Sequence, residues 1–239
     1  MGFPFSPNYM KAFLLAAGNG TRLRPITDTT PKCLLPIRGK PLLQIWLELC
    51  KRSGIDEVLI NVHAHPEIVR EYLARDGHGL KIKLFEEPTL LGSAGTVDAN
   101  RDWVAGESAF WILYADVLTN IDLTAMFGYH SSRETPVTLS VYQVPDPSRC
   151  GVVVLDSNGI VREFVEKPAT PVSNLAFSGV LLAGPQLLDG IPDRRPADIG
   201  FDVLPKLAGK MSAHITGDYF QDIGTLENYK LAQATWPGI

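Results

Sequence analysis

Residues 13–41 read FLLAAGNGTRLRPITDTTPKCLLPIRGKP, in which a short apolar run, a glycine turn and a basic segment follow one another directly. The apolar run, residues 12–17, is long enough for a buried strand and too short for a typical helix. Glycines in the turn 18–21 let the backbone bend sharply, so that loop amides can point at an anion. Positive charge follows at Arg22, Arg24 and Lys32. This order of features indicates a site that holds a polyphosphate.

The glycine turn differs from two common nucleotide-binding motifs. It is not a Walker A loop, because no Gly-Lys-Ser/Thr follows, and it lacks the third glycine of the Rossmann fingerprint. The wider pattern is L-A-A-G-x-G-T-R-L-R-P, then P-K-C-L-L-P-I, then G-K-P-L. It resembles the signature loop of the sugar-1-phosphate nucleotidyltransferases, the enzymes that make nucleotide sugars. Ala17 stands where many members of that family carry a further glycine.

The composition is that of an ordinary globular protein. Of 239 residues, 45% are hydrophobic and 20% are charged. The net charge of −4 argues against general nucleic-acid binding, which requires a basic excess. No apolar run approaches the roughly 20 residues of a membrane span, and the N-terminus lacks the pattern of a signal peptide. We expect residues 1–9 to form a flexible arm and residues 10–239 to form a single nucleotidyltransferase domain.

The cysteines and histidines indicate no metal centre. Cys33, Cys50 and Cys150 are widely spaced, which predicts reduced thiols, a cytoplasmic location and no zinc site. Cys33 follows Lys32 and could be reactive, although a packing role is favoured. Two histidines near residue 64 lack a cysteine or a third histidine to support them, so we expect both in a loop. They are His63 and His65.

Helical and strand patterns alternate through the first half of the chain. Strands are expected at residues 57–61, 81–85 and 109–114, and helices at 42–53, 66–75 and 96–103. This alternation predicts an α/β fold with a doubly wound, mainly parallel, Rossmann-like sheet and helices on both faces. Ligands of such sheets bind at the carboxyl ends of the strands.

The second half of the chain is richer in strands. Strands are expected at residues 136–144, 151–156, 160–165 and 177–182, with an Asn-Gly hairpin turn between the second and third, and helices at 201–208 and 226–235. We therefore expect an inserted β-rich half, which the resemblance identifies as sugar-binding. Hexapeptide repeats of the β-helix domain that some family members carry do not occur, so a short form of the family is expected.

Two carboxylates follow strand ends. Asp116 comes directly after the strand at 109–114, and Asp222 opens the segment DIGTLENY. Each alone could be a helix cap or a turn residue. Beside a phosphate loop, however, they suggest a Mg²⁺ site, because magnesium prefers carboxylates together with substrate phosphates. The resemblance implies the same metal ligands, although Ala115 replaces the glycine of the family's Gly-Asp motif.

A third motif is Glu166-Lys167-Pro168. It could be only an exposed strand end. The resemblance implies that Lys167 binds the phosphate of a sugar 1-phosphate and that Glu166 contacts sugar hydroxyls. It also assigns three further residues to the sugar-phosphate site, namely Gly151, Ser178 and Gly179.

The segment FEEPTLLGSAGT, residues 85–96, resembles the base-reading loop of the family. Thymidylyl relatives carry Gln in place of Glu87. A carboxylate only accepts hydrogen bonds, and guanine offers two adjacent donors, whereas thymine and uracil would set a carbonyl oxygen against it. Glu87 therefore favours GTP. In the other interpretation Glu87 is a solvated loop acid, and backbone groups of Gly92 and Gly95 choose the base.

The resemblance implies attack of a sugar-1-phosphate oxygen on the α-phosphorus of a nucleoside triphosphate, with pyrophosphate as the leaving group. Such chemistry depends on positioning and on charge neutralisation. The implied catalytic residues are Arg22, Lys32, Asp116, Lys167 and Asp222, of which Asp116 and Asp222 hold the metal. The implied nucleotide-binding residues are Leu15, Ala16, Ala17, Gly18, Asn19, Gly20, Thr21, Arg22, Glu87, Gly92, Ser93 and Ala94.

We expect GTP and a manno-configured hexose or heptose 1-phosphate as substrates of a monomer or homodimer. A uridylyl- or thymidylyltransferase acting on glucose 1-phosphate or on an N-acetylated sugar phosphate is the alternative. A catalytically dead subunit of the same fold would have lost one of the charged residues Arg22, Lys32, Asp116 and Asp222, and all four are present. A glycosyltransferase would carry Asp-x-Asp where residues 116–118 are Asp-Val-Leu.

Overall fold

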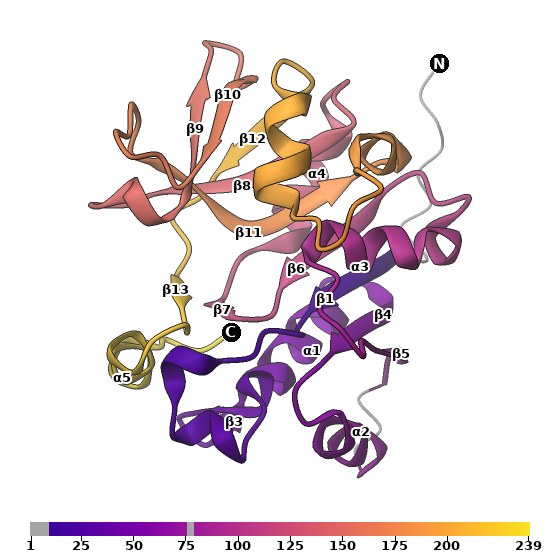
Figure 1. The fold of residues 1–239 in the computed structure, drawn as a ribbon. Coiled ribbons are helices and arrows are strands. Elements are labelled where there is room, and N and C mark those ends of the chain that lie inside the picture. Colours follow the sequence, from indigo (N-terminus) through magenta and orange to yellow (C-terminus); the bar gives the residue numbers. More distant parts are fainter. Residues whose placement is uncertain (1–9, 76–78) are drawn as a thin grey trace.

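The computed structural model describes residues 10–75 and 79–239, so the arm expected over residues 1–9 lies outside the described residues. A nine-stranded sheet forms the centre, in the order β10-β9-β11-β6-β1-β4-β5, and β8 branches from β11 and pairs in turn with β12 (Figure 1). Its strands are β1 (Met10–Leu15), β4 (Ile55–Val62), β5 (Lys81–Glu86), β6 (Phe110–Tyr114), β8 (Val137–Gln143), β9 (Gly151–Leu155), β10 (Val161–Glu166), β11 (Leu175–Ala183) and β12 (Met211–Ile215).

The sheet has a parallel part and a mixed part. Strands β6, β1, β4 and β5 pair in parallel, as the alternating first half of the chain predicts. Strand β11 runs antiparallel to β6, β8 and β9, and β9 and β10 form the antiparallel hairpin expected from Asn-Gly. The expected α/β fold is therefore confirmed, with its antiparallel pairs concentrated in the second half.

The central strand β1 explains why two apolar cores form. Its residues alternate between the two faces of the sheet, so Ala12 and Leu14 join one buried cluster while Phe13 joins the other. All three are fully buried. Helices α1 (Leu42–Arg52), α2 (Pro66–Arg75), α4 (Leu123–Ser131) and α5 (Leu226–Thr235) contribute to the first cluster, and α3 (Ser93–Ala99) contributes to the second.

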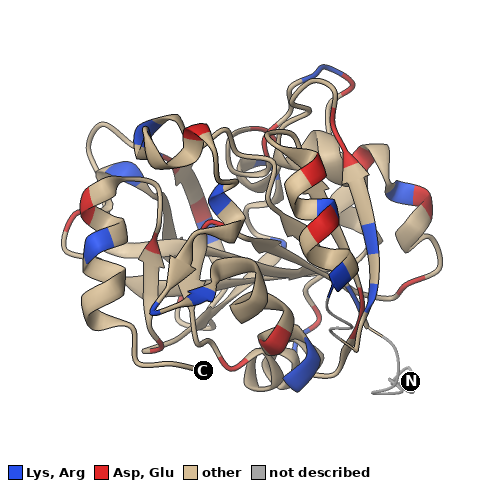
Figure 2. Cartoon of the chain, turned by 90° about the horizontal axis from the view of Figure 1, so that it is seen from below, with Lys and Arg blue, Asp and Glu red and all other residues tan. Residues whose placement is uncertain are grey.

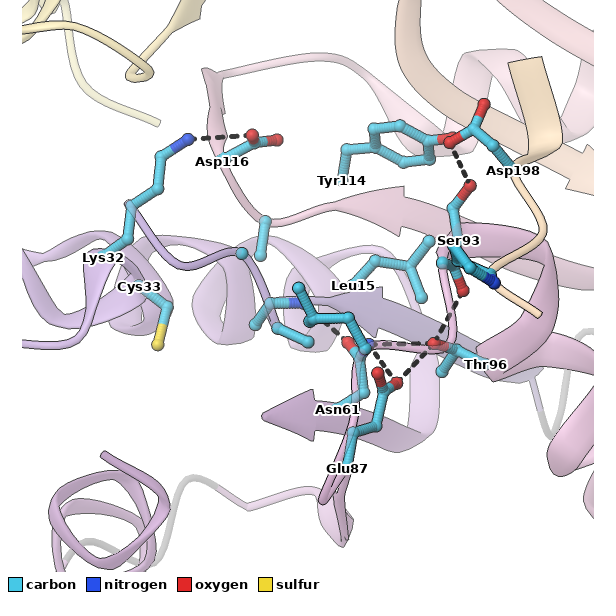
Figure 3. Close-up of a pocket in the computed structure, with 17 residues that line it drawn as sticks. Leu15, Lys32, Cys33, Asn61, Glu87, Ser93, Thr96, Tyr114, Asp116 and Asp198 are labelled. Carbon is cyan, nitrogen blue, oxygen red and sulfur yellow. Dashed lines mark hydrogen bonds and ion pairs between the residues drawn. The ribbon is translucent and has the colours of Figure 1, made fainter. Parts of the chain in front are cut away.

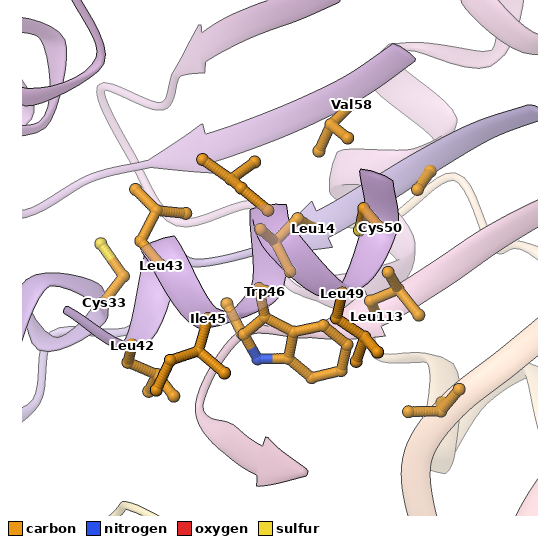
Figure 4. Close-up of a cluster of buried hydrophobic side chains, with 14 of the residues drawn as sticks. Leu14, Cys33, Leu42, Leu43, Ile45, Trp46, Leu49, Cys50, Val58 and Leu113 are labelled. Carbon is orange, nitrogen blue, oxygen red and sulfur yellow. The ribbon is translucent and has the colours of Figure 1, made fainter. Parts of the chain in front are cut away.

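Helix α1 packs its apolar side chains into the first cluster, together with Leu14, Val58 and Leu113 of the neighbouring strands (Figure 4). Its apolar residues recur at helical spacing, and Ile45, Trp46 and Leu49 are almost completely buried. Burying a side chain of this size stabilises the fold by about 1.5–3 kcal/mol. The indole Nε1 of Trp46 also donates to the Val117 carbonyl at 2.8 Å, which ties the helix to the chain beyond β6.

Two helix predictions differ from the structure. The helix expected at 96–103 begins at Ser93 and ends at Ala99, because Gly92, with φ of +79°, makes the turn and Gly95 lies inside the helix. The helix expected at 201–208 is a π-helical turn, residues 199–203, followed by a 3₁₀ turn, residues 204–207. Pro205 explains the second change, since its ring lacks an amide hydrogen and clashes with an α-helical carbonyl one turn earlier.

A small ribbon outside the main sheet brings the end of the chain to the ends of the parallel strands. Strands β7 (Val117–Thr119) and β13 (Phe220–Asp222) pair in antiparallel fashion. Helix α5 follows β13 and lies beside the hairpin β2 (Pro36–Ile37) and β3 (Lys40–Pro41), where the Tyr229 hydroxyl donates to the Pro36 carbonyl at 2.8 Å. The signature segment and the last helix are thus in contact.

The charged residues are distributed over many elements. In Figure 2, basic and acidic segments alternate along the same helices and loops, in keeping with the small net charge.

No helix within residues 10–75 and 79–239 has both the length and the apolar character needed to cross a membrane.

Candidate active site

A cavity of about 410 Å³ opens at the carboxyl ends of β1, β4, β5 and β6 (Figure 3), where ligands of parallel sheets bind. Nine of the residues predicted for the site line it, namely Leu15, Ala16, Ala17, Gly18, Lys32, Glu87, Gly92, Ser93 and Asp116. It is also lined by residues that the sequence did not single out, among them Asn61, Thr96, Tyr114 and Asp198. The cavity therefore joins the signature loop to the segment expected to read the base.

The glycine turn has the geometry that its sequence requires. Gly20 has φ of +63°, a left-handed conformation that glycine adopts without strain. A side chain there would place its Cβ 2.9 Å from Cγ2 of Thr27, whose hydroxyl donates to the Gly20 carbonyl at 2.8 Å. Three of the predicted loop residues do not line the cavity and lie further along the turn, namely Asn19, Gly20 and Thr21.

A close ion pair lies at one end of the cavity. The Lys32 Nζ lies 2.8 Å from Oδ2 of Asp116, and the Lys32 side chain is 9% exposed while that of Asp116 is 41% exposed. The pair joins the signature segment to the end of β6, across 84 residues of sequence. Lys32 is therefore held by a carboxylate that itself faces the solvent-accessible side of the site.

The backbone segments that carry the two predicted metal ligands are neighbours at the β7–β13 ribbon. The backbone amide of Ile223, next to Asp222, donates to the carbonyl of Asp116 at 2.9 Å. The Asp222 Oδ1 accepts from the Gly224 amide at 2.7 Å. A Cβ on Gly224 would lie 2.8 Å from Nη2 of Arg22, so the predicted arginine lies here as well.

This donor set fits Mg²⁺. Carboxylate oxygens are the ligands that the ion prefers, and it usually takes only one or two from the protein, with substrate phosphates and water completing its shell. In the described part of the chain, no cluster of three or more His, Cys, Asp or Glu side chains is arranged to hold a metal by itself.

The two histidines lie in the loop after β4, as expected. They are His63 and His65, and the Nδ1 of His63 lies 2.7 Å from the Glu87 carbonyl oxygen.

Glu87 lies at the other end of the cavity, but its oxygens are already engaged (Figure 3). Oε1 accepts from Asn61 Nδ2 at 2.8 Å and from the Thr96 hydroxyl at 2.5 Å, and Oε2 accepts from the Leu91 amide at 3.0 Å. A carboxylate has about four acceptor sites, so about one remains. The predictions that Glu87 offers two acceptors to guanine, and that it is a solvated acid, are therefore both wrong for this arrangement. Glu87 is 3% exposed and holds the loop 87–92.

The residues predicted for the sugar phosphate gather beside the β9–β10 hairpin. A Cβ on Gly151 would lie 2.7 Å from Oε2 of Glu166, so glycine permits this close approach. Burial raises the pKa of the Glu166 carboxyl, and Lys167 Nζ lies 3.7 Å from its Oε1. Lys167 has φ of +50° and is more than half exposed. None of these three residues lines the cavity described above.

Ser178 and Gly179, on β11, complete the predicted sugar-phosphate set. Gly179 has φ of +82°, and a Cβ there would lie 3.0 Å from Cβ of Tyr114, so this strand packs against the end of β6. The Ser178 hydroxyl is buried and has no hydrogen-bond partner among the described residues.

Asp198 links the two halves of the site. Its Oδ2 accepts from the Ser93 hydroxyl at 2.8 Å, and its Oδ1 accepts from the Phe201 amide at 3.0 Å. Burial, followed by the negative charge of Asp198, raises the pKa of the Tyr114 hydroxyl well above its usual range. Tyr114 is the last residue of β6, and its position at a strand end could have marked it in the sequence as a residue of the site. Asp198 lies in the irregular segment 191–198, where no sequence pattern marks it as a residue of the site.

Cys33 and Cys50 have packing roles, as expected. Burial raises the pKa of the Cys33 and Cys50 thiols to about 12, so both are protonated at neutral pH. Cys33 lines the cavity but is 3% exposed, and the interpretation of Cys33 as a reactive thiol is not supported.

The cavity at the parallel strand ends, the glycine turn and the Lys–Asp pair place the chain in the class of α/β proteins with a ligand site at the carboxyl edge of the sheet. The chain belongs to the family described as "Nucleotidyl transferase", whose sequence model matches residues 11–236. This result confirms the resemblance seen in the signature loop.

Curated relatives carry two different base specificities in their names. The chain is 35% identical over 227 residues to "Mannose-1-phosphate guanylyltransferase 1" of Arabidopsis thaliana, covering 92% of this chain and 63% of the relative. It is 35% identical over 239 residues to "UTP--glucose-1-phosphate uridylyltransferase" of Synechocystis, covering 92% and 61%. The chain thus spans somewhat less than two thirds of the length of these relatives.

Solved structures share the fold. HddC from Yersinia pseudotuberculosis superposes with a TM-score of 0.80 at 24% identity, covering 95% of this chain and 99% of that one. A putative glucose-1-phosphate thymidylyltransferase from Bacillus anthracis superposes with a TM-score of 0.83 at 23% identity, covering 94% of each chain.

Proposed function

We propose that this chain joins a nucleoside triphosphate to a sugar 1-phosphate, giving a nucleotide sugar and pyrophosphate. The observation that carries the proposal is the Lys32–Asp116 pair at the mouth of a nucleotide-sized cavity, with Asp222 and Arg22 beside it. A charged cluster of this kind suits phosphoryl chemistry, which depends on positioning and charge neutralisation and needs no covalent nucleophile.

Each side chain has a distinct role in this proposal. Residues 18–21 hold the triphosphate through the backbone amides of the glycine turn, and Arg22 neutralises the charge that grows on the leaving pyrophosphate. Lys32 contacts the reacting phosphates, and Lys167 holds the attacking sugar phosphate. Asp116 and Asp222 would hold Mg²⁺, which would supply positive charge against the substrate phosphates when bound.

We propose GTP and a manno-configured hexose or heptose 1-phosphate as substrates. Several relatives at 33–35% identity are named mannose-1-phosphate guanylyltransferases, which supports this choice. A uridylyltransferase acting on glucose 1-phosphate is the second candidate, favoured by the Synechocystis relative.

The absence of paired cysteines among the described residues is consistent with a cytoplasmic enzyme. The oligomeric state that we propose is a monomer or a homodimer.

The test of the proposal is pyrophosphate release from GTP, UTP, dTTP and ATP, each combined with a panel of sugar 1-phosphates. We expect the highest kcat/KM for GTP. A preference for UTP or dTTP would overturn the base assignment and leave the reaction class intact. No release with any pair, from protein that binds a triphosphate, would favour the catalytically dead subunit.

Glu87→Gln is expected to narrow the preference for GTP over UTP by about tenfold. The glutamine side chain has a single carbonyl oxygen, so it cannot accept from Asn61, Thr96 and the Leu91 amide all at once, and at least one bond that shapes the loop is lost. Losing a hydrogen bond to a charged group costs about 1.5–3 kcal/mol, which corresponds to tenfold or more. The ratio of kcat/KM for GTP and UTP measures the effect. An unchanged ratio would show that the loop chooses the base without this carboxylate.

Lys167→Ala is expected to raise the KM for the sugar 1-phosphate tenfold or more, because it removes a charge-assisted contact with that phosphate. The Kd for GTP should stay within about twofold of wild type, since Lys167 lies outside the nucleotide cavity. Steady-state kinetics together with calorimetric titration of GTP separate the two substrates. Equal weakening of both would point to a shared structural role instead.

A further inference from the structure

Asn61 is the last but one residue of β4, and its amide group connects the two loops of the nucleotide cavity (Figure 3). Its Oδ1 accepts from the Ala16 amide at 2.7 Å, at the start of the signature loop. Its Nδ2 donates to Glu87 Oε1 at 2.8 Å and to the Thr96 hydroxyl at 3.0 Å. Asn61 is 4% exposed, so these bonds form away from bulk water.

The direction of these bonds is determined by the groups involved. A backbone amide can only donate, so the oxygen of Asn61 faces Ala16 and its NH₂ group must face Glu87 and Thr96. Thr96 accepts from Asn61, and its own hydrogen faces two acceptors, Glu87 Oε1 at 2.5 Å and the Gly92 carbonyl at 3.1 Å, of which Glu87 is the closer. Glu87 then accepts from the Leu91 amide. One continuous chain of hydrogen bonds therefore joins the loop for the phosphates to the loop for the base.

Each link of this chain is buried, which makes its loss costly. Asn61, Glu87 and Thr96 are all less than 5% exposed, and Thr96 is fully buried. Removing one partner leaves a buried donor or a buried charge without its hydrogen bond. Satisfied networks of this kind hold their members in one arrangement.

We infer that Asn61 is a positioning residue for nucleotide binding, one that fixes the loop at residues 87–92 relative to the loop at residues 15–20. The inference rests on the proposed function, since it assumes that the cavity holds a nucleoside triphosphate. A ligand whose phosphates lie on one loop and whose base lies on the other binds best when the spacing of the loops is set in advance. Asn61 contributes that spacing without contacting the reacting atoms.

The test is calorimetric titration of GTP into the wild type, Asn61→Ala and Asn61→Asp. We expect both variants to bind GTP about 10- to 100-fold more weakly at pH 8. Asn100→Ala and Asn100→Asp are the matched controls, because Asn100 is 5% exposed, follows the C-terminal end of α3, donates to the Thr96 carbonyl at 3.1 Å and does not line the cavity. The controls should lose a similar amount of thermal stability and bind GTP within about twofold of wild type.

The pH dependence of Asn61→Asp separates positioning from packing. When two carboxylates lie next to each other, repulsion between their charges makes the pair keep one proton up to a higher pH than an isolated carboxylate would. The introduced aspartate, once protonated, can again donate to Glu87 while it accepts from the Ala16 amide. The ratio of variant to wild-type Kd should therefore fall between pH 8 and pH 6 for Asn61→Asp and stay constant for Asn61→Ala. Taking the ratio cancels the groups common to both proteins: His63 beside Glu87, and the cavity residues Lys32, Asp116 and Asp198.

Each outcome bears on one claim. If the wild type binds no triphosphate, the proposed function fails before the variants are considered. If the wild type binds GTP while Asn61→Ala binds it equally well, the inference is overturned. A constant ratio for Asn61→Asp across the pH range would also overturn it, by showing a packing effect alone. Should Asn61→Asp fail to fold at pH 8, Asn61→Ala and the nearly isosteric Thr96→Val still test the same chain of bonds.

Discussion

Asp116→Asn is expected to fold normally and to lose about 10²–10³-fold in turnover. The substitution keeps the size of the side chain but removes the charge that pairs with Lys32 at 2.8 Å and that would hold the metal beside Asp222. The side chain is 41% exposed, so the fold depends little on its charge. Pyrophosphate release at saturating substrates measures the loss.

The control for this experiment is Asp102→Asn, which removes an exposed carboxylate outside the cavity and should leave turnover within about twofold of wild type. Thermal unfolding of both variants checks that the fold is intact. Turnover of Asp116→Asn close to that of the wild type would remove Asp116 from the catalytic set. It would also leave Asp222 as the only carboxylate assigned to the metal.

Lys32→Met should reduce kcat/KM by about 10²–10³-fold while changing stability by about 1 kcal/mol or less. Methionine replaces the apolar stem of lysine and lacks only the terminal ammonium group, so the packing of a side chain that is 9% exposed is largely kept. The substitution removes the cation that we assign to the substrate phosphates. Asp116 loses its partner but can be hydrated, because it is partly exposed, and this is why the defect should appear in turnover and not in folding.

Lys40→Met is a close match for comparison. Lys40 Nζ lies 2.7 Å from Oε2 of Glu48, so this variant also breaks a Lys–carboxylate pair of nearly the same length, but away from the cavity. Wild-type activity in Lys40→Met with a large loss in Lys32→Met would assign the effect to position and not to the loss of an ion pair. Equal losses in both variants would contradict the role proposed for Lys32.

The sequence was informative where local pattern and chemistry coincide. The signature loop, the strand ends and the first helix could all be located, because glycine turns and apolar periodicity are local signals. Helix α4 was missed, although Asp122 caps it by accepting from the Ala125 amide at 2.9 Å, and its buried residues recur at helical spacing. Strand β12 was missed because it is short and its first three residues are all buried, which hides the alternation of a strand.

The hydrogen-bond partners of Glu87 could not have been found in the same way. Asn61 lies 26 residues before it and Thr96 lies 9 residues after it, and the sheet and α3 bring them together only in the folded chain. Sequence chemistry correctly identified Glu87 as an acceptor, but tertiary structure decides whether its lone pairs face a ligand or the protein. Asp198 was missed for the same reason, since its closeness to Ser93 depends on packing across 105 residues.

The β7–β13 ribbon has a consequence for the order in which the protein matures during its synthesis. The strands that build the nucleotide cavity all precede residue 115, whereas Asp222 joins its partner strand from a point about a hundred residues later. At about 5–20 residues per second, the ribosome needs on the order of 5–20 s to cover that distance. We therefore expect a nascent chain to form the strand-end side of this cavity several seconds before Asp222 emerges, whereas the side lined by Pro196 and Asp198 follows only shortly before Asp222. Translation itself would then delay turnover until the last helix has emerged and docked.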